Sequence, residues 1–126
     1  MKKKIYYHDT DCGKVVYYAN YLKYMEEART EYLAERGVSI KDLVEKGAYF
    51  VVAHQEIDYK APAFYGDILE VSTKIACVST VKIEYEHEVK NQQGQAICVG
   101  KAILVCVDNQ IKPKSIPEDI RQKLSR

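Results

Sequence analysis

The segment YANYLKYMEEARTEYLAER, residues 18–36, decides the fold, because its apolar residues recur with the period of an α-helix. Apolar positions are spaced by three and four, and charged residues such as Glu26, Arg29 and Glu31 lie between them. Gly37 follows and favours the left-handed conformation that ends a helix. The segment therefore predicts an amphipathic helix of several turns with one buried face. Its apolar positions are Tyr18, Tyr21, Leu22, Met25, Ala28, Tyr32 and Leu33.

The sequence after this helix is strand-like. Four stretches are rich in β-branched, aromatic and alternating residues, and NQQG at 91–94 is typical of a hairpin turn. Consecutive strands joined by such short connections are expected to pair antiparallel. The stretches are YFVVAHQEIDY (49–59), DILEVSTKIACV (67–78), TVKIEYEHEV (80–89) and AICVGKAILVCVD (96–108).

Within residues 80–89, alternate positions are apolar and charged, so one face of the sheet should be packed and the other wet. The long helix is the obvious packing partner for the apolar face. We therefore predict an α+β architecture, with one antiparallel sheet wrapped around one long central helix.

Four shorter segments flank these elements. Residues 2–7 could form a short strand, and HDTDCGK at 8–14 collects the residue types that favour turns. SIKDLVEK at 39–46 predicts a second, short helix that begins at a serine cap. SIPEDIRQKL at 115–124 carries a proline near a first helical turn and predicts a short surface helix.

Length and composition favour one folded domain covering residues 1–126. The hydrophobic fraction of 47% and the charged fraction of 29% are typical of globular chains. The net charge of +1 gives no long-range attraction to nucleic acid or to an anionic membrane, so neither partner is expected. No signal-peptide core and no membrane-spanning apolar run is found, which predicts a soluble, cytoplasmic protein.

The four cysteines, Cys12, Cys77, Cys98 and Cys106, are far apart and form no CxxC pair. The last three interrupt strand-like apolar runs. We therefore expect reduced thiols within the core rather than disulfides.

The sequence lacks the motifs that are typical of several classes of enzyme. The sequence has no glycine-rich phosphate loop, no GxSxG elbow and no His/Cys cluster with metal-ligand spacing. His8, His54 and His87 occur singly, whereas zinc needs three or four converging ligands. Neither a metal nor another cofactor is expected.

The loop that leads into the long helix carries Asp9, Asp11 and Gly13. A helix N-terminus offers unpaired N–H groups and a partial positive charge, both of which can polarise a carbonyl oxygen. A carboxylate a few residues earlier could lie beside the same carbonyl. On spacing alone, however, ordinary turn or capping roles are the better interpretation of such aspartates.

The stretch from Tyr7 to Tyr32 closely resembles the signature of the 4-hydroxybenzoyl-CoA thioesterase family of hot-dog-fold proteins, in particular its YbgC-like acyl-CoA thioesterase branch. A second match lies farther along, in the segment between two strands of that fold. The resemblance covers nearly the whole chain and implies a hot-dog fold. The matching residues are Tyr7, Asp9, Thr10, Asp11, Gly13, Val15, Val16, Tyr17, Asn20 and Tyr21, followed by Tyr59, Pro62, Gly66 and Asp67.

By this resemblance, Asp11 is the catalytic carboxylate and acts as a nucleophile or as a general base on water. Asp9 would hold the loop through backbone hydrogen bonds. The backbone amide of Tyr18 would polarise the thioester carbonyl, and Gly13 would let the loop turn close to the substrate.

Many YbgC-like proteins carry His at the position of Tyr18. A phenol cannot replace an imidazole as a base at neutral pH, so this chain departs from that pattern.

Three functions are weighed on this basis. The first is an acyl-CoA thioesterase. The second is a hot-dog hydratase or dehydratase, which would need a His/Asp or His/Glu pair near the helix, and the sequence suggests none there. The third is a binding module for acyl-CoA or an acyl carrier with little turnover.

The resemblance also implies a homo-oligomer, a dimer or a tetramer, because family members join their sheets edge to edge and form active sites between subunits.

Overall fold

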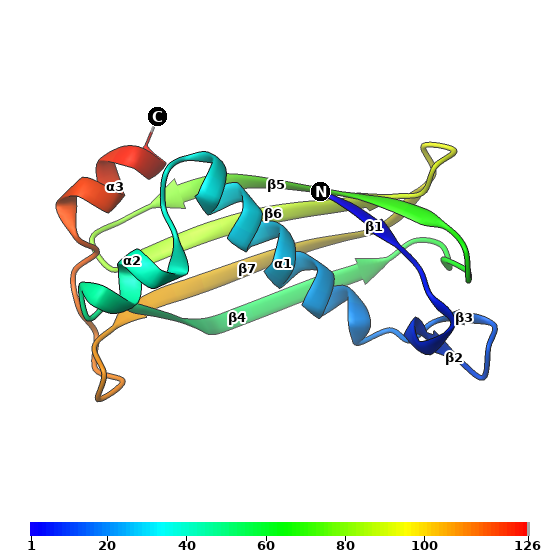
Figure 1. Ribbon diagram of the computed structural model, residues 1–126, viewed down its shortest axis with the longest axis horizontal. Helices are drawn as coiled ribbons and strands as arrows, with labels where there is room; N and C mark the ends of the chain where they lie inside the picture. Colours follow the sequence, from blue (N-terminus) through cyan, green and yellow to red (C-terminus); the bar gives the residue numbers. More distant parts are fainter. Residues whose placement is uncertain (126) are drawn as a thin grey trace.

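The computed structural model describes residues 1–125 and contains a five-stranded antiparallel sheet with a long helix across one face (Figure 1). The strand order is β1-β5-β6-β7-β4, so β1 and β4 form the two edges. The strands are β1 (Lys2–Lys4), β4 (Tyr49–Tyr59), β5 (Ile68–Val78), β6 (Lys82–Lys90) and β7 (Ala96–Val107).

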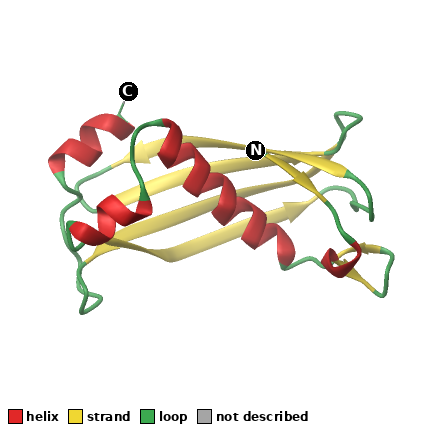
Figure 2. Ribbon diagram, viewed as in Figure 1, coloured by secondary structure: helices red, strands yellow, loops and turns green. Residues whose placement is uncertain are grey.

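The long helix α1 (Asn20–Glu35) lies across the sheet and buries one of its faces (Figure 2). Met25 is fully buried and lies against Gly100 of β7, where an added Cβ would come within 2.8 Å of the Met25 Cε. The absence of a side chain at Gly100 therefore lets helix and sheet approach closely. The predicted α+β architecture, one antiparallel sheet around a central helix, is confirmed.

Two short helices complete the fold. Helix α2 (Ile40–Glu45) begins at Ser39, whose Oγ accepts a hydrogen bond from the Asp42 N–H at 3.0 Å, as the predicted serine cap requires. Helix α3 (Glu118–Leu124) buries Ile120 and Leu124 in the core. Both helices were predicted within a few residues of their observed ends.

The N-terminal part of the chain departs from the prediction in detail. Helix α1 starts at Asn20 rather than Tyr18, because the Asn20 N–H bonds to the Tyr17 carbonyl in a turn before the helix. The expected loop at 8–14 contains regular structure. It includes most of a 3₁₀ helix (Tyr7–Asp9) and the strand β2 (Thr10–Asp11), which pairs with β3 (Val15–Val16).

The expected pairing of β4 with β5 is wrong. β4 pairs with β7 along its whole length, and two strands separate it from β5. The eight residues between Tyr59 and Ile68 can span about 26 Å, whereas the distance across three strand spacings is only ~15 Å. The connection is therefore long enough to cross the end of the sheet. The other two consecutive pairs, β5 with β6 and β6 with β7, are antiparallel as predicted.

The cysteines divide into two groups, and all four are free thiols. Cys98 and Cys106 are buried as predicted, whereas Cys77 and Cys12 are exposed, which corrects the prediction of a core thiol at Cys77. A β-bulge follows Ile75 and places Cys77 opposite the outward-facing Glu84. The alternation of inward-facing and outward-facing side chains that the sequence suggested for β5 is therefore broken after Ile75.

No helix within residues 1–125 is both long enough and apolar enough to cross a membrane.

Candidate functional site

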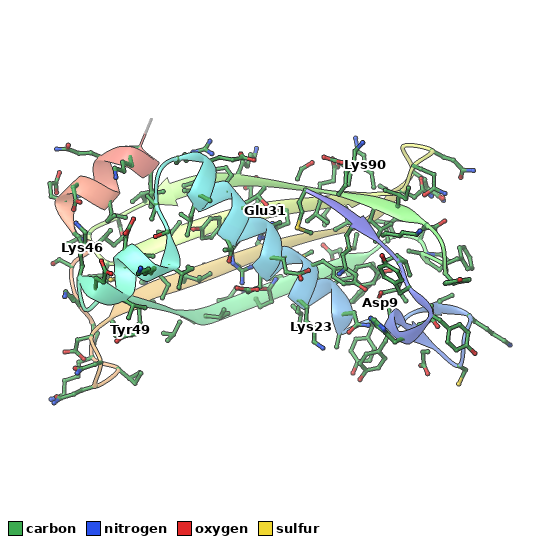
Figure 3. The ribbon with its side chains drawn as sticks, viewed as in Figure 1. Asp9, Lys23, Glu31, Lys46, Tyr49 and Lys90 are labelled. Atoms are coloured by element: carbon green, nitrogen blue, oxygen red, sulfur yellow. The ribbon has the colours of Figure 1, made fainter. Side chains whose placement is uncertain are left out.

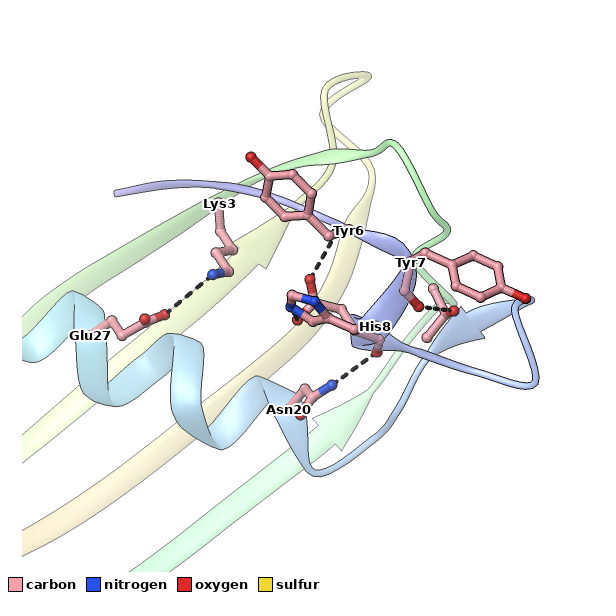
Figure 4. A network of polar contacts seen from close by, with 8 residues as sticks. Lys3, Tyr6, Tyr7, His8, Asn20 and Glu27 are labelled. Carbon is pink, nitrogen blue, oxygen red and sulfur yellow. Dashed lines mark hydrogen bonds and ion pairs between the residues drawn. The ribbon is translucent and has the colours of Figure 1, made fainter.

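Asp9 anchors the loop that precedes α1, and Figure 4 shows the dashed contacts that its neighbours Tyr6 and Asn20 make in this loop. Its side chain is buried, and its Oδ2 accepts a hydrogen bond from the Tyr6 N–H at 2.9 Å. Its backbone carbonyl accepts two more, from the Tyr17 N–H and from the Asn20 Nδ2, each at 2.9 Å. The structural role expected for Asp9 is confirmed, since it ties the loop to the start of the helix.

Asp11 lies two residues farther, at the end of β2, where it pairs with Val15 of β3. A tight turn connects the two strands, with Cys12 at φ 54° and Gly13 at φ 71°. The Asp11 side chain is exposed. Within residues 1–125 its carboxylate accepts no hydrogen bond and forms no ion pair. The loop therefore presents a carboxylate whose oxygens are both available to a ligand.

The start of α1 supplies unpaired backbone donors next to this loop. The Tyr17 and Asn20 N–H groups are occupied, but those of Tyr18 and Ala19 find no acceptor in the described part of the chain. Ala19 is the N-cap and gives no side-chain cap. These free N–H groups, at the positive end of the helix dipole, can donate to a carbonyl oxygen or an oxyanion.

Gly13 allows the turn to pack against an aromatic ring. An added Cβ at this position would lie 2.7 Å from the Tyr7 hydroxyl and 3.0 Å from its Cε1, and the positive φ already disfavours other residues. The immediate neighbour of Gly13 is therefore Tyr7. A contact between Gly13 and a substrate remains a prediction.

Tyrosine rings surround the start of α1. The ring centroids of Tyr17 and Tyr18 are 4.9 Å apart, and those of Tyr18 and Tyr59 are 6.4 Å apart. The Tyr59 hydroxyl donates to the Tyr18 carbonyl at 3.0 Å, which holds the turn that carries the free Tyr18 N–H. The pKa of Tyr17 is raised, mainly by the hydrogen bond and charge of Tyr18 and least by the Asp11 carboxylate.

Tyr59 matches the family motif in the sequence, but the resemblance implies no role for it. The only available signal was its position as the last residue of a strand, before a proline-containing connection. Its contact with Tyr18 depends on the crossing of α1 over β4, which no local pattern specifies.

The two segments that matched the family signature lie side by side. The Val16 N–H bonds to the Ala63 carbonyl at 2.9 Å, and Val15 forms a bridge with Phe64. The Asp67 Oδ2 accepts a hydrogen bond from the Phe64 N–H at 2.9 Å and so closes the supporting turn. The second segment therefore supports the strand that carries the Asp11 turn.

This loop itself begins with a histidine next to Asp9, contrary to the expectation that no His/Asp pair is found by the helix. The His8 Nε2 is 3.8 Å from the Asp9 Oδ1, and the His8 side chain is largely exposed. No group of three or more His, Cys, Asp and Glu side chains within residues 1–125 is arranged to hold a metal ion.

The site thus combines an unpaired carboxylate, free helix N-terminal amides and aromatic surface. This arrangement can attack or activate water at an acyl carbon while the amides stabilise the developing oxyanion.

Comparison with known proteins agrees with this chemistry. Residues 6–124 match the family model of the thioesterase-like superfamily. The chain belongs to this superfamily. It is 34% identical to the acyl-CoA thioester hydrolase YbgC of Escherichia coli over 118 residues, which cover 93% of this chain and 88% of that protein. The resemblance to the YbgC-like branch is confirmed.

Solved structures of other members share the fold. The DHNA-CoA thioesterase of Staphylococcus aureus superposes with a TM-score of 0.94 at 26% identity, covering 99% of this chain and 87% of that one. A Thermus thermophilus thioesterase solved with coenzyme A and zinc gives a TM-score of 0.83 at 31% identity, covering 98% and 89%. The predicted hot-dog fold is confirmed.

Proposed function

We propose that this member of the thioesterase-like superfamily hydrolyses acyl-CoA thioesters to a free acid and CoA. The observation that carries the proposal is the unpaired carboxylate of Asp11, on a loop that Asp9 ties to the uncapped start of α1. The named activities of the E. coli and S. aureus relatives, and the coenzyme A bound in the T. thermophilus structure, support CoA as the thiol.

In this mechanism the Tyr18 N–H donates to the thioester oxygen while Asp11 acts at the carbonyl carbon. Asp11 either attacks that carbon directly or removes a proton from the attacking water. The carbon–sulfur bond breaks, the CoA thiolate leaves with the bonding electrons, and water supplies the hydroxyl of the acid. Gly13 keeps the turn free of a side chain beside this centre. A thiolate is a good leaving group, so the mechanism needs no dedicated acid.

The test is thiol release from short, medium and aromatic acyl-CoAs by wild type, Asp11→Asn and Asp58→Asn. Asp58 is an exposed aspartate on β4 and serves as the matched control. We expect Asp11→Asn to lower kcat/KM by ~100-fold or more while the control keeps its rate. Circular dichroism would confirm folding. A folded Asp11→Asn enzyme with wild-type turnover would refute the assignment.

A hydratase or dehydratase is the second candidate, because His8 lies close to Asp9 at the same loop. Spectrophotometric hydration of enoyl-CoA would detect it. The third candidate, a binding module for acyl-CoA or an acyl carrier, would show ligand binding with little thiol release.

We further propose that residues 1–126 form a single domain and that the protein is a homo-oligomer, a dimer or more specifically a tetramer. The long edge strand β4 supports this proposal, because its outer side has no partner in the described chain. A cytoplasmic location is part of the proposal, and the free thiols of Cys12 and Cys77 suit a reducing compartment.

A further inference from the structure

Arg29 is buried at the middle of α1 with most of its hydrogen-bonding capacity unused. The residue is only 7% exposed, and its Nη1 lies 3.3 Å from the His87 Nε2. Since a guanidinium only donates, the imidazole nitrogen is the acceptor of this bond. The remaining N–H groups of the guanidinium find no acceptor within residues 1–125. They are therefore available to a ligand.

The charge of Arg29 has no paired counterion in the described part of the chain, since no carboxylate there forms an ion pair with it. Burial lowers the pKa of Arg29, and the charge of Glu26 opposes this shift. Glu26 is exposed, and its Oε1 accepts a hydrogen bond from the Thr30 hydroxyl at 3.2 Å instead. A buried charge without a partner is costly, so an anionic group beside Arg29 would be stabilised.

The guanidinium lines a hollow between α1, α2 and β4. The hollow has a volume of about 310 Å³, near the lower end of the roughly 300–1,000 Å³ that small-molecule sites occupy. Its wall is mostly aliphatic and aromatic, and Ile40 and Val44 of α2 are exposed where they line it. The buried and half-buried part of this wall includes Leu33, Leu43, Phe50 and Leu104.

Tyr85 supplies a second polar group to the same hollow. It lines the hollow and is only 2% exposed, yet its hydroxyl makes no hydrogen bond within residues 1–125. The Arg29 Cζ lies 5.8 Å from the centroid of its ring. Burial raises the pKa of Tyr85 to about 12, so at neutral pH the phenol keeps its proton and can donate. The wall thus contains two neighbouring donors that lack acceptors.

These features favour one class of ligand. An inorganic anion would leave the apolar wall unfilled, and a neutral chain would leave the guanidinium without an acceptor. An aliphatic carboxylate satisfies both, because its oxygens match the fork of the guanidinium and its chain covers the apolar wall. The hollow holds about ten water-sized volumes of ~30 Å³, which suits a medium-chain acid such as octanoate.

Within one chain this hollow is remote from the Asp11 loop. Figure 3 shows Tyr49, which lines the hollow, and Asp9, which anchors the loop, at opposite ends of the molecule. Along α1, Arg29 lies roughly 16 Å beyond Tyr18 at a rise of ~1.5 Å per residue. The hollow is therefore distinct from the carboxylate and amides at the start of the helix.

We propose that the hollow between α1, α2 and β4 is a binding site for a free medium-chain aliphatic carboxylate, held by the Arg29 guanidinium and the Tyr85 hydroxyl. The acid that the proposed hydrolysis releases belongs to this class, and only this link to a product rests on the proposed function. The site itself follows from the unused donors and the apolar wall.

Calorimetric titration of the protein with octanoate tests the site. We expect one octanoate per chain, with octanol, which has the same chain and no charge, binding at least tenfold more weakly. Arg29→Gln should weaken octanoate binding at least tenfold, and Arg29→Lys should retain part of it. Tyr85→Phe should weaken binding about threefold without loss of stability, because the hydroxyl has no partner in the protein. Glu26→Gln should tighten binding by about two- to fivefold.

Val44 keeps the test decisive if the Arg29 variants fail to fold, because its side chain is exposed. Val44→Glu places a negative charge at the hollow and should weaken octanoate binding at least fivefold, whereas Val44→Gln should bind as wild type does. The matched control is Ile68→Glu, the same kind of change at an exposed position of β5 that does not line the hollow. A Val44→Glu protein that binds octanoate as tightly as this control overturns the site.

Two further measurements separate this site from the substrate. Asp11→Asn should leave the octanoate dissociation constant unchanged, whereas tighter binding would place the acid beside the Asp11 loop and overturn the proposal. A dicarboxylyl-CoA that is hydrolysed faster than its monocarboxylyl counterpart by wild type, but not by Val44→Glu, would also overturn it, because the hollow would then hold the distal carboxylate of a substrate.

The binding result is independent of turnover. No octanoate binding at millimolar concentration, or equal binding of octanol, overturns the site even if thiol release is intact. Octanoate binding with the expected response of the Val44 variants supports the site even if the protein releases no thiol, so failure of the proposed hydrolysis is recognised separately.

Discussion

The imidazole of His87 is held uncharged in the core, so acidification should destabilise the fold through this side chain. Burial is the main cause that lowers its pKa from the ordinary 6.5 to about 4, and the charge of Arg29 adds to it. A hydrogen bond involving the Ser72 backbone opposes the shift. The groups facing the ring are Arg29 from α1, Thr73 from β5 and Tyr85, which stacks on it from β6.

The sign follows from proton uptake. Below pH 6.5 the unfolded chain protonates His87, whereas the folded protein resists protonation until about pH 4. Stability is therefore fully retained above pH 6.5, falls as the pH drops toward 4, and changes no further through this residue below that. Between pH 7 and pH 4.5, the two pKa values give a loss of about 2.5 kcal/mol in the free energy of unfolding.

Urea denaturation of wild type and His87→Gln at pH 7, 6, 5 and 4.5 measures this contribution. Glutamine does not titrate and can both accept from Arg29 and donate to Thr73. The carboxylates contribute equally to both proteins, so the difference between the two stability curves isolates His87. We expect His87→Gln to gain about 2.5 kcal/mol relative to wild type over this range. Parallel curves would refute the argument that the ring is buried and neutral.

Three further substitutions test the loop and the core. Asp9→Ala leaves the Tyr6 N–H without an acceptor and should cost about 1–3 kcal/mol in thermal melts, with a loss of thiol release that Asp9→Asn partly avoids. Gly13→Ala forces a Cβ against the Tyr7 hydroxyl at positive φ, so thiol release should fall, and adding Tyr7→Ala should recover part of it. Gly100→Ala crowds Met25 and should lower stability in urea by about 1–3 kcal/mol, whereas unchanged stability would show that Met25 moves aside freely.

The elements of this fold could be predicted because their signals are local. The period of α1, the serine cap of α2 and the turn at 91–94 all lie within short windows of sequence. The partner of β4 could not be predicted, because β5 and β7 both read as strands with an apolar face and the choice depends on the path of the connection from β4 to β5. The exposure of Cys77 depends on a bulge, which shifts the side-chain alternation without leaving a residue-type signal.

The site was predictable to the extent that it depends on one loop. The Asp9–Asp11 spacing and the following helix were visible in the sequence, but spacing alone favoured ordinary turn residues, and the family resemblance gave Asp11 its role. The contact of Tyr59 with Tyr18 depends on tertiary geometry, whereas His8 is the sequence neighbour of Asp9 and its proximity was open to prediction. The helical pattern predicts Arg29 on the charged face of α1, whereas the structure buries it against His87.

The two aspartates of the loop show why neighbouring carboxylates can have different roles. Asp9 is buried, and its Oδ2 already accepts a hydrogen bond from the Tyr6 N–H. Breaking this bond to free the carboxylate for catalysis would cost stability. Asp11 has no such bond and is therefore positioned only by its backbone, through the β2–β3 pairing and the turn at Gly13. A nucleophile or general base needs free lone pairs, and of the two only Asp11 is both solvent-exposed and free of partners. The bonds of Asp9 tie this loop to the start of α1, so the loop is held in place while the Asp11 carboxylate itself stays unbonded.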